Sequence, residues 1–182
     1  NLMKFSINQK DLQQSLSHCQ GVIEKRSTLP ILSNVMLEAN NSILKITATD
    51  LDLIFINEIS NVEVHKEGKT TTSSSIMYDI IRKFSSGKKI NFNLATENKI
   101  QVESEKSIFN LNCISASEFP ITEEKFNQEA LTLNSKQLLK LMNKCKFSIS
   151  NDETRHYLSG IFFHQNQIED KHFLTAVATD SH

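Results

Sequence analysis

Two stretches of the sequence decide the fold. Residues 8–19 read NQKDLQQSLSHC and residues 134–145 read NSKQLLKLMNKC, so Asn, Lys, Leu and Cys recur after 126 residues. Extending the comparison to residues 5–37 and 131–163 gives eight identical pairs among 33, where average residue usage predicts roughly two. Pairs such as Phe5/Leu131 and Leu16/Met142 keep their apolar character. The chain therefore contains an internal repeat.

The repeat sets the predicted domain organisation. Beyond residue 37 it resumes after an insertion of four residues, with Thr49-Asp50 aligned on Thr179-Asp180. The first copy extends to about Phe126, and the second stops at His182, which aligns with Asp52. We predict a complete domain at residues 1–126 and an incomplete one at residues 127–182. We also expect the natural chain to begin at Met3 and to continue past His182.

A complete copy is predicted to contain a strand, a helix and three strands, and then the same series again. The first half has a strand at 4–8, a helix at 10–23, and strands at 31–39, 43–49 and 51–57. The second half has strands near 61–65 and 69–72, a helix from 75 to 84, and strands at 89–94, 99–103 and 107–112. This pattern predicts an α+β fold with two helices packed on one face of antiparallel sheet.

Composition argues against several classes of protein. No apolar run approaches the ~20 residues of a transmembrane helix. With 4 Gly and 2 Pro the chain has no glycine-rich phosphate loop, and its 3 Cys and 6 His form no zinc motif. We therefore expect reduced thiols, no metal and no cofactor. The formal net charge of −1 argues against DNA binding through overall attraction, but not against charges sorted onto separate faces.

Basic residues do gather on the predicted helices. In the helix at residues 135–145, an apolar stripe is predicted to face the core: Leu138, Leu139, Leu141, Met142 and Cys145. The opposite face carries a lysine at every fourth position: Lys136, Lys140 and Lys144. Arg82 lies on the polar face of the helix at 75–84. Such faces suit loose contact with a phosphate backbone, although lysines also simply solvate an exposed helix.

Six short motifs extend over the whole chain. They are residues 3–5 (MKF), 26–34 (RSTLPILSN), 47–51 (TATDL), 117–120 (SEFP), 155–160 (RHYLSG) and 178–182 (ATDSH). In order and spacing they resemble the bacterial sliding clamp, the beta subunit family of DNA polymerase III. The resemblance covers the family's first domain and the start of its second, and the third is absent from this sequence. It implies a DNA-clamp fold, with helices lining a homodimeric ring that encloses double-stranded DNA.

The resemblance also implies roles for single residues. Four match positions that meet DNA: Arg26, Arg82, His156 and Tyr157. Four match one wall of a pocket that receives a short peptide motif: Leu158, Thr179, Ser181 and His182. Ser181 replaces a glycine that is common in the family, and His156 replaces a tyrosine. Phe109 and Leu111 match an edge strand that pairs with the third domain of a partner subunit.

The implied function is a sliding clamp that gives the replicative polymerase its processivity, in the bacterial cytoplasm at the replication fork. The implied partners are DNA, the catalytic subunit of DNA polymerase III, the clamp loader and other proteins with a clamp-binding motif, with no membrane. From the residues alone, the default interpretation of Tyr157, Leu158, Phe109 and Leu111 is that they are core residues.

Two other functions remain open. One is a non-catalytic scaffold that binds protein motifs without enclosing DNA, in which case replacing Lys140 and Lys144 with Glu has no effect. The other is an enzyme that uses Asp50 and Asp52, or their counterparts Asp180 and His182, as metal ligands or as an acid/base pair. Asp in a Thr-Asp turn between strands is a sufficient explanation, and no nucleophile and base can be assembled. We therefore expect no catalysis.

Overall fold

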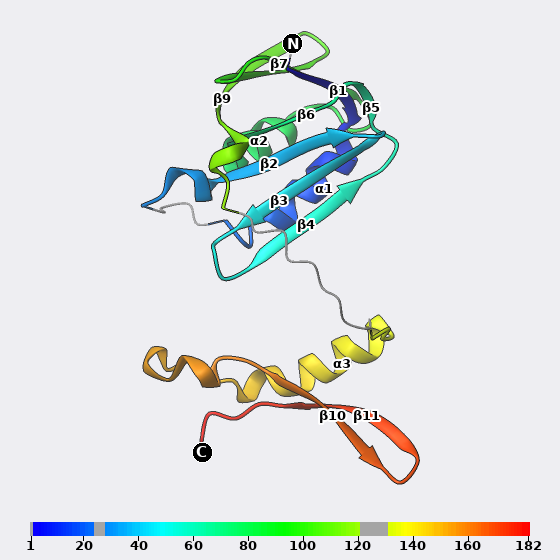
Figure 1. Ribbon diagram of the computed structural model, residues 1–182, viewed down its shortest axis with the longest axis vertical. Helices are drawn as coiled ribbons and strands as arrows, with labels where there is room; N and C mark the ends of the chain where they lie inside the picture. Colours follow the sequence, from blue (N-terminus) through cyan, green and yellow to red (C-terminus); the bar gives the residue numbers. More distant parts are fainter. Residues whose placement is uncertain (1, 24–27, 121–130) are drawn as a thin grey trace. The chain divides into compact units, whose positions relative to one another are not determined.

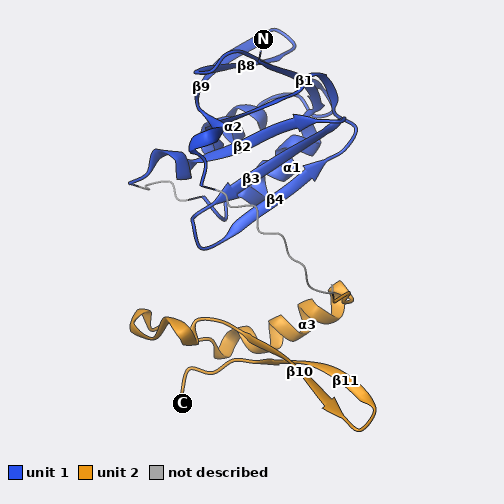
Figure 2. Cartoon of the chain, viewed as in Figure 1, with its two compact units in different colours: residues 1–123 blue, residues 124–182 orange. Residues whose placement is uncertain are grey.

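The computed structural model describes residues 2–23, 28–120 and 131–182 (Figure 1). It divides into two compact units, Asn1–Glu123 and Glu124–His182, which are described separately (Figure 2). The domain boundary predicted at residue 126 lies outside the described residues, and so does Arg26.

Unit 1 consists of two halves in which a strand, a helix and three strands recur in the same order, with β5 and short 3₁₀ helices in addition. The first half contains β1 (Met3–Asn8), α1 (Gln9–Cys19), the 3₁₀ helix η1 (Pro30–Ser33), β2 (Asn34–Asn40), β3 (Ile43–Thr49) and β4 (Ile54–Ile59). The second half contains β5 (Glu63–Lys66), β6 (Gly68–Ser73), α2 (Ser74–Ile81), β7 (Lys89–Thr96), β8 (Lys99–Ser104) and β9 (Ser107–Ile114), followed by η2 (Ala116–Glu118). The predicted α+β class is confirmed, and so is the repeated series of strand, helix and three strands.

Several predicted element boundaries are wrong for local reasons. The helix predicted to reach Ile23 ends at Cys19, because Gly21 and the β-branched residues after it favour other conformations. Residues 31–33 are helical rather than extended, since Pro30 supplies a φ suited to the first turn of a helix and has no N–H to leave unpaired. The helix predicted to reach Phe84 ends at Ile81 and continues as isolated turns.

The strand predicted to begin at Leu51 begins at Ile54, because a tight turn precedes it. Asp50 Oδ1 accepts hydrogen bonds from the backbone N–H groups of Asp52 and Leu53, at 3.0 and 2.7 Å. Thr49 Oγ1 accepts one from the backbone of Leu51 at 3.0 Å. Leu51 itself has a φ of +84°, in the left-handed region that L side chains avoid. The turn therefore depends on the side chains of Thr49 and Asp50.

The two halves of unit 1 exchange one strand each. All strand pairs are antiparallel, and the sheet order is β4-β3-β2-β6-β9-β8-β7-β1-β5. β1 therefore lies in the sheet of the second half, beside β7, while β6 lies beside β2 in the first. The exchanged strands lead directly into the helices, which are capped by Asn8 and Ser73.

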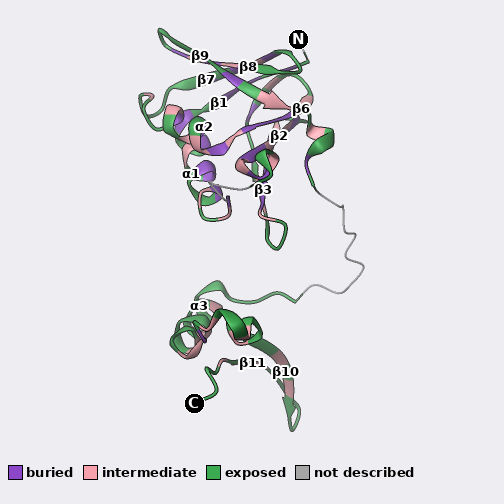
Figure 3. Cartoon of the chain, turned by 90° about the vertical axis from the view of Figure 1, so that its left-hand side faces the viewer, coloured by how far each residue is buried: buried purple, intermediate pink, exposed green. Residues whose placement is uncertain are grey.

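The core of unit 1 lies between the helices and the sheet. α1 and α2 pack side by side over the strands (Figure 1), and Gln9 Nε2 donates to the carbonyl oxygen of Ile81 at 2.9 Å. Phe5 of β1 stacks on Phe92 of β7 with ring centroids 4.7 Å apart. The core is therefore shared between both halves (Figure 3).

All three cysteines are free, and burial raises the pKa of the Cys19 thiol to about 12.

Unit 2 repeats unit 1 from its first helix onward. It contains α3 (Ser135–Cys145), η3 (Lys146–Ser148), η4 (Glu153–Leu158), β10 (Phe162–Ile168) and β11 (Lys171–Val177). After 126 residues, α3 begins and ends where α1 does. The Asn8 and Asn134 side chains each accept a hydrogen bond from the backbone of the lysine two residues on, at 2.9 and 3.1 Å. These bonds explain why Asn recurs at the start of both helices.

The helix α3 is far less covered than α1. Leu138, Leu141 and Cys145 are only half-buried, and Leu139 and Met142 are 58% and 41% exposed (Figure 3). The prediction that Leu139 and Met142 face a core is wrong for the described residues. Leu16, the counterpart of Met142, is fully buried in unit 1, where α1 packs against α2. Among the described residues of unit 2 no second helix of this kind is present.

Replacing Leu51 with Gly is expected to stabilise unit 1. Glycine adopts a positive φ without the ~1–2 kcal/mol that an L side chain costs there, so the free energy of unfolding should rise by about 1 kcal/mol. Urea denaturation followed by circular dichroism measures the change.

Leu53→Gly is the matched control, because Leu53 is 53% exposed against 56% for Leu51 and its φ is not positive. It should leave stability unchanged or lower it. If the two variants are equally stable, the turn at Leu51 is not strained.

Candidate functional site

The lysine face of α3 is open to solvent. Lys136, Lys140 and Lys144 are all exposed, and Lys140 and Lys144 lie beside the half-buried Leu138 and Leu141 at the edge of a groove. None of them takes part in an ion pair among the described residues. Asn134 fixes the start of the helix by accepting hydrogen bonds from the backbone of Lys136 and Gln137. Three positive charges are thus displayed in a row without a partner to neutralise them.

Arg82 is also exposed, but it is already engaged. It follows the last residue of α2, and its Nε lies 3.1 Å from Asp79 Oδ1. Its guanidinium carbon lies 6.0 Å from the centroid of the Tyr78 ring. An exposed pair of this kind contributes little to stability, so it leaves Arg82 able to exchange Asp79 for another anion.

An ion pair organises the loop that contains η4. Asp152 accepts hydrogen bonds from the hydroxyl of Thr154 at 2.6 Å and from Nε of Arg155 at 2.8 Å. These two groups lower the pKa of the Asp152 carboxyl, with the Thr154 hydroxyl as the larger cause. Arg155 Nη1 also donates to Ser181 Oγ at 2.5 Å. Arg155 therefore connects the η4 loop to the segment after β11.

His156 and Tyr157 stand on the outside of this loop. Tyr157 is 72% exposed, so the interpretation of Tyr157 as a core residue is wrong for the described residues. The two rings meet edge to face with centroids 6.1 Å apart. Their exposure leaves both rings free to stack on or bond to a ligand.

The four predicted pocket residues belong to the two segments that the Arg155–Ser181 hydrogen bond connects, the η4 loop and the segment after β11. Leu158 is the last residue of η4 and is half-buried, while Thr179, Ser181 and His182 are exposed. Thr179 Oγ1 accepts a hydrogen bond from the backbone of Ser181 at 3.0 Å, and Asp180 Oδ1 accepts one from His182 at 3.1 Å. Ser181 has a φ of +70°, like Leu51 in the first copy. Asp50 and Asp180 are therefore turn formers, as predicted.

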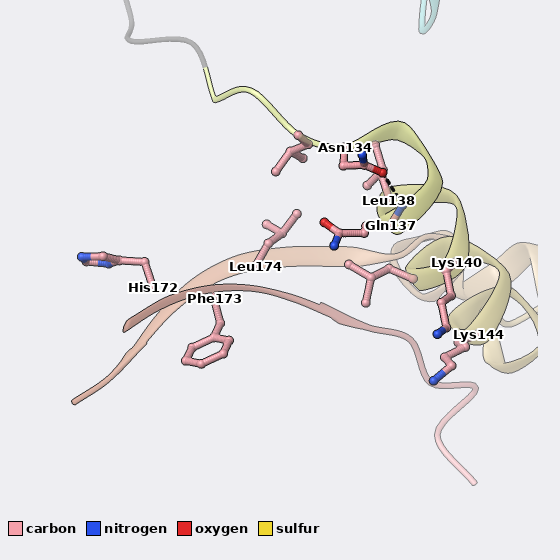
Figure 4. A pocket seen from close by; sticks show the side chains of 10 residues that line it. Asn134, Gln137, Leu138, Lys140, Lys144, His172, Phe173 and Leu174 are labelled. Atoms are coloured by element: carbon pink, nitrogen blue, oxygen red, sulfur yellow. Dashed lines mark hydrogen bonds between the residues drawn. The ribbon is translucent and has the colours of Figure 1, made fainter. Parts of the chain in front are cut away.

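A groove separates α3 from β11 in unit 2. Its volume is about 430 Å³, with Leu138 and Leu141 on the helix side and Phe173 and Leu174 on the strand side. Figure 4 shows Lys140 and Lys144 at one end and His172 at the other. The groove is thus apolar in the middle and basic at the end where the carboxyl-terminal half of α3 lies. It was not predicted from the sequence.

Phe109 and Leu111 have different environments in β9. Phe109 is 40% exposed and its ring lies 5.9 Å from that of Phe84. Leu111 is 6% exposed and belongs to the core of unit 1. Its side chain faces the core, so it would reach a partner only through its backbone, and its assignment to an interface stays a prediction. β9 meets β6 only at Cys113 and Ile114, so the backbone edge of β9 before them is open in the described residues.

One serine in unit 1 touches a histidine. Ser6 Oγ lies 3.3 Å from His65 Nε2 and donates its proton to Asn91 Oδ1 at 2.7 Å. Because that proton points to Asn91, His65 is not placed to remove it.

Among the described residues, no group of three or more His, Cys, Asp or Glu side chains is arranged to hold a metal ion. No helix in the described part of the chain is both long and apolar enough to cross a bilayer.

The chain was compared with known proteins. Residues 3–123 match the sequence model of the family described as DNA polymerase III beta subunit, N-terminal domain. The beta sliding clamp of Caulobacter vibrioides is 33% identical over 181 residues, which is 99% of this chain and 48% of that protein. The clamp of Escherichia coli K12 is 31% identical over 180 residues. The chain spans about half the length of these relatives.

Solved structures agree with the fold. The crystal structure of the Caulobacter crescentus beta sliding clamp superposes with a TM-score of 0.92 at 33% identity, covering 99% of this chain and 48% of that one. The DNA polymerase sliding clamp of Bacillus subtilis, at 24% identity, gives a TM-score of 0.90 over 100% of this chain and 48% of that one.

Replacing Thr154 with Val is expected to raise the pKa of Asp152 toward its ordinary value of 3.8, because the hydroxyl is the larger of the groups that lower it. Arg155→Met should raise it less. An NMR titration of the Asp152 carboxyl carbon measures both. Since the folded pKa lies below the unfolded one, the stabilisation is complete above pH 3.8 and is lost as the pH falls through the folded pKa. A larger effect of Arg155→Met would contradict this order.

Proposed function

The chain belongs to the family of the DNA polymerase III beta subunit, and on that premise we propose that it forms part of a sliding clamp. In this role it encloses duplex DNA and keeps a replicative polymerase close to its template. It performs no catalysis itself. It works in the bacterial cytoplasm, at the replication fork.

The lysine face of α3 is the observation that carries the proposal. Three unpaired lysines on one helix face attract phosphates at any sequence, because they offer point charges and no group shaped to read a base edge. Weak contacts of this kind exchange rapidly along the backbone, which is what a sliding protein needs. Each unit also carries further residues that we assign to DNA contact: Arg82 in unit 1, and His156 and Tyr157 in unit 2. Arg26, which lies outside the described residues, is assigned the same role.

Topology rather than affinity explains how such weak contacts suffice. A closed ring leaves a duplex only at an end or by opening, so its residence does not depend on tight binding. A polymerase bound to the ring stays at a high effective concentration beside the DNA. The net charge of −1 agrees with this mechanism, because a strongly basic chain would hold the DNA in place.

Two further surfaces complete the proposed assembly. Leu158, Thr179, Ser181 and His182 form one wall of a pocket for short peptide motifs, and the link from Arg155 to Ser181 holds the two parts of that wall together. Motifs from the catalytic subunit, the clamp loader and other partners would bind at micromolar affinity, about −8 kcal/mol. Phe109 and the open edge of β9 form the subunit interface of a homodimeric ring.

Removing two charges from the lysine face is expected to weaken DNA binding. Lys136→Gln combined with Lys140→Gln should lower the slope of log affinity against log salt concentration by about 2 for duplex DNA, because each phosphate contact contributes about 0.9. Fluorescence anisotropy with a labelled duplex at several salt concentrations measures it.

The matched control replaces Lys99 and Lys106, two exposed lysines at the ends of the β8 hairpins, with Gln. It changes the net charge equally and should leave the slope unchanged. If both pairs have the same effect, binding reflects overall charge only. If neither has an effect, the chain is better explained as a scaffold for peptide motifs.

A ring that contains this chain should be retained on closed circular DNA and released when the circle is linearised, because a ring slides off a free end. Gel filtration of the loaded DNA before and after cutting with a restriction enzyme measures retention. Equal retention on both forms would exclude encirclement and leave only direct binding.

A further inference from the structure

The lysine face of α3 has a counterpart in unit 1. Counted back by 126 residues, its three lysines correspond to Lys10, Gln14 and His18 of α1. All three side chains are exposed, while the apolar residues of α1 are buried. Because α1 and α3 begin and end at equivalent positions, both rows lie on the same face of the repeated helix. We call Lys10, Gln14 and His18 the α1 row.

The α1 row is as open as the lysine face. Among the described residues, Lys10 and His18 take part in no ion pair. The ring of His18 meets that of Phe55 in β4 edge to face, with centroids 6.1 Å apart. Asn57 Nδ2 donates to Ser15 Oγ at 2.9 Å, so this amide and this hydroxyl are engaged with each other rather than with the imidazole. The aromatic contact holds the imidazole at the edge of α1 and leaves it accessible to a ligand.

Two carboxylates lie beside the α1 row. A groove of about 430 Å³ between α1 and the end of β4 is lined by Gln14 and His18 and also by Asp11 and Glu58. In the described part of the chain, these two acidic residues are the charged side chains that line the groove with His18. In α3 the counterpart of Asp11 is the neutral Gln137. With a neutral imidazole, the α1 row therefore offers one positive charge beside two negative ones and attracts phosphates poorly.

Protonation of His18 changes this balance. Histidine is the residue type whose side chain ordinarily changes its charge between about pH 5 and 8. An imidazolium at position 18 places a positive charge where α3 has Lys144, and both of its ring nitrogens donate hydrogen bonds. A charged donor bonds to a phosphate oxygen more strongly than a neutral one. The α1 row then resembles the lysine face, with a cation at each end and the Gln14 amide between them.

We propose that His18 makes the contact between unit 1 and a DNA backbone depend on pH. In acidic solution Lys10 and His18 each hold a phosphate. In alkaline solution only Lys10 does, and α3 provides most of the attraction. Each phosphate contact releases counterions, so the change appears as a steeper dependence of affinity on salt. The proposal rests on the proposed clamp function, because it takes duplex DNA as the ligand of the repeated helix face.

His18→Gln tests the proposal in the 182-residue chain. Fluorescence anisotropy with a labelled duplex measures the slope of log affinity against log salt concentration at pH 8 and at pH 5.5. In the unaltered chain the slope should be steeper at pH 5.5, since His18 and His156 both gain charge. His18→Gln should reduce that increase by about 0.9, the share of one phosphate contact.

His65→Gln is the matched control, because His65 is an exposed histidine of the same unit that lies on β5 rather than on a helix. It should keep the full increase in slope of the unaltered chain. An equal increase in the unaltered chain and in His18→Gln would overturn the proposal, and so would an equal loss in His18→Gln and His65→Gln.

Exchanging residues between the two helices gives a second test. Lys144→His should flatten the slope by about 0.9 at pH 8 and restore it at pH 5.5, which transfers the pH dependence to unit 2. His18→Lys should steepen the slope by about 0.9 at pH 8 and show the same reduced pH response as His18→Gln. If the slope of Lys144→His does not recover at pH 5.5, an imidazole cannot replace a lysine on this face and the proposal is wrong.

The same measurements separate this inference from the proposed function. If the lysine variants at positions 136 and 140 flatten the slope at pH 8 while His18→Gln keeps its full pH response, only the role of His18 is wrong. If neither the lysine variants nor a change of pH alters the slope, duplex DNA is not the ligand of this helix face, and both proposals fail.

Discussion

The pairing of β1 with β7 is the constraint on which unit 1 depends. It joins Met3 to Leu94 and Asn8 to Lys89, so the first strand of one half completes the sheet of the other. In the same way, β6 of the second half pairs with β2 and completes the sheet of the first half. Since each helix begins directly after an exchanged strand, the same pairing sets where α1 and α2 lie. Neither half of unit 1 has a complete sheet or a closed core without the other.

Local signals made much of this fold predictable. Asn8 and Asn134 cap their helices through the same hydrogen bond, and the apolar spacing that follows is read directly from the chain. Features that depend on packing were less accessible. The exposure of Met142 and the burial of Leu111 depend on which helices and strands pack against these side chains. Residue type and spacing along the chain do not contain that information. The turn at Thr49-Asp50 was predicted, but its extension through Leu51 was missed because a leucine gives no sign of a positive φ.

The candidate sites divide in the same way. The lysine face of α3 follows from a spacing of four on a helix, so the sequence was sufficient to find it. The link from Arg155 to Ser181 joins residues 26 positions apart through a turn that places Ser181 in the left-handed region. The groove beside β11 required knowledge of the strand pairs.

The strand exchange also bears on how the protein is made. A ribosome adds about 5–20 residues per second. The first strand meets its first strand partner, β5, only after about 60 residues, and its second, β7, after some 85. Phe5 and its apolar neighbours must wait several seconds in a nascent chain before Phe92 arrives to cover them. Contacts so distant in sequence also slow folding, because a long loop must close before they form. During synthesis, the amino terminus of unit 1 is therefore the segment most exposed to chaperones and to aggregation.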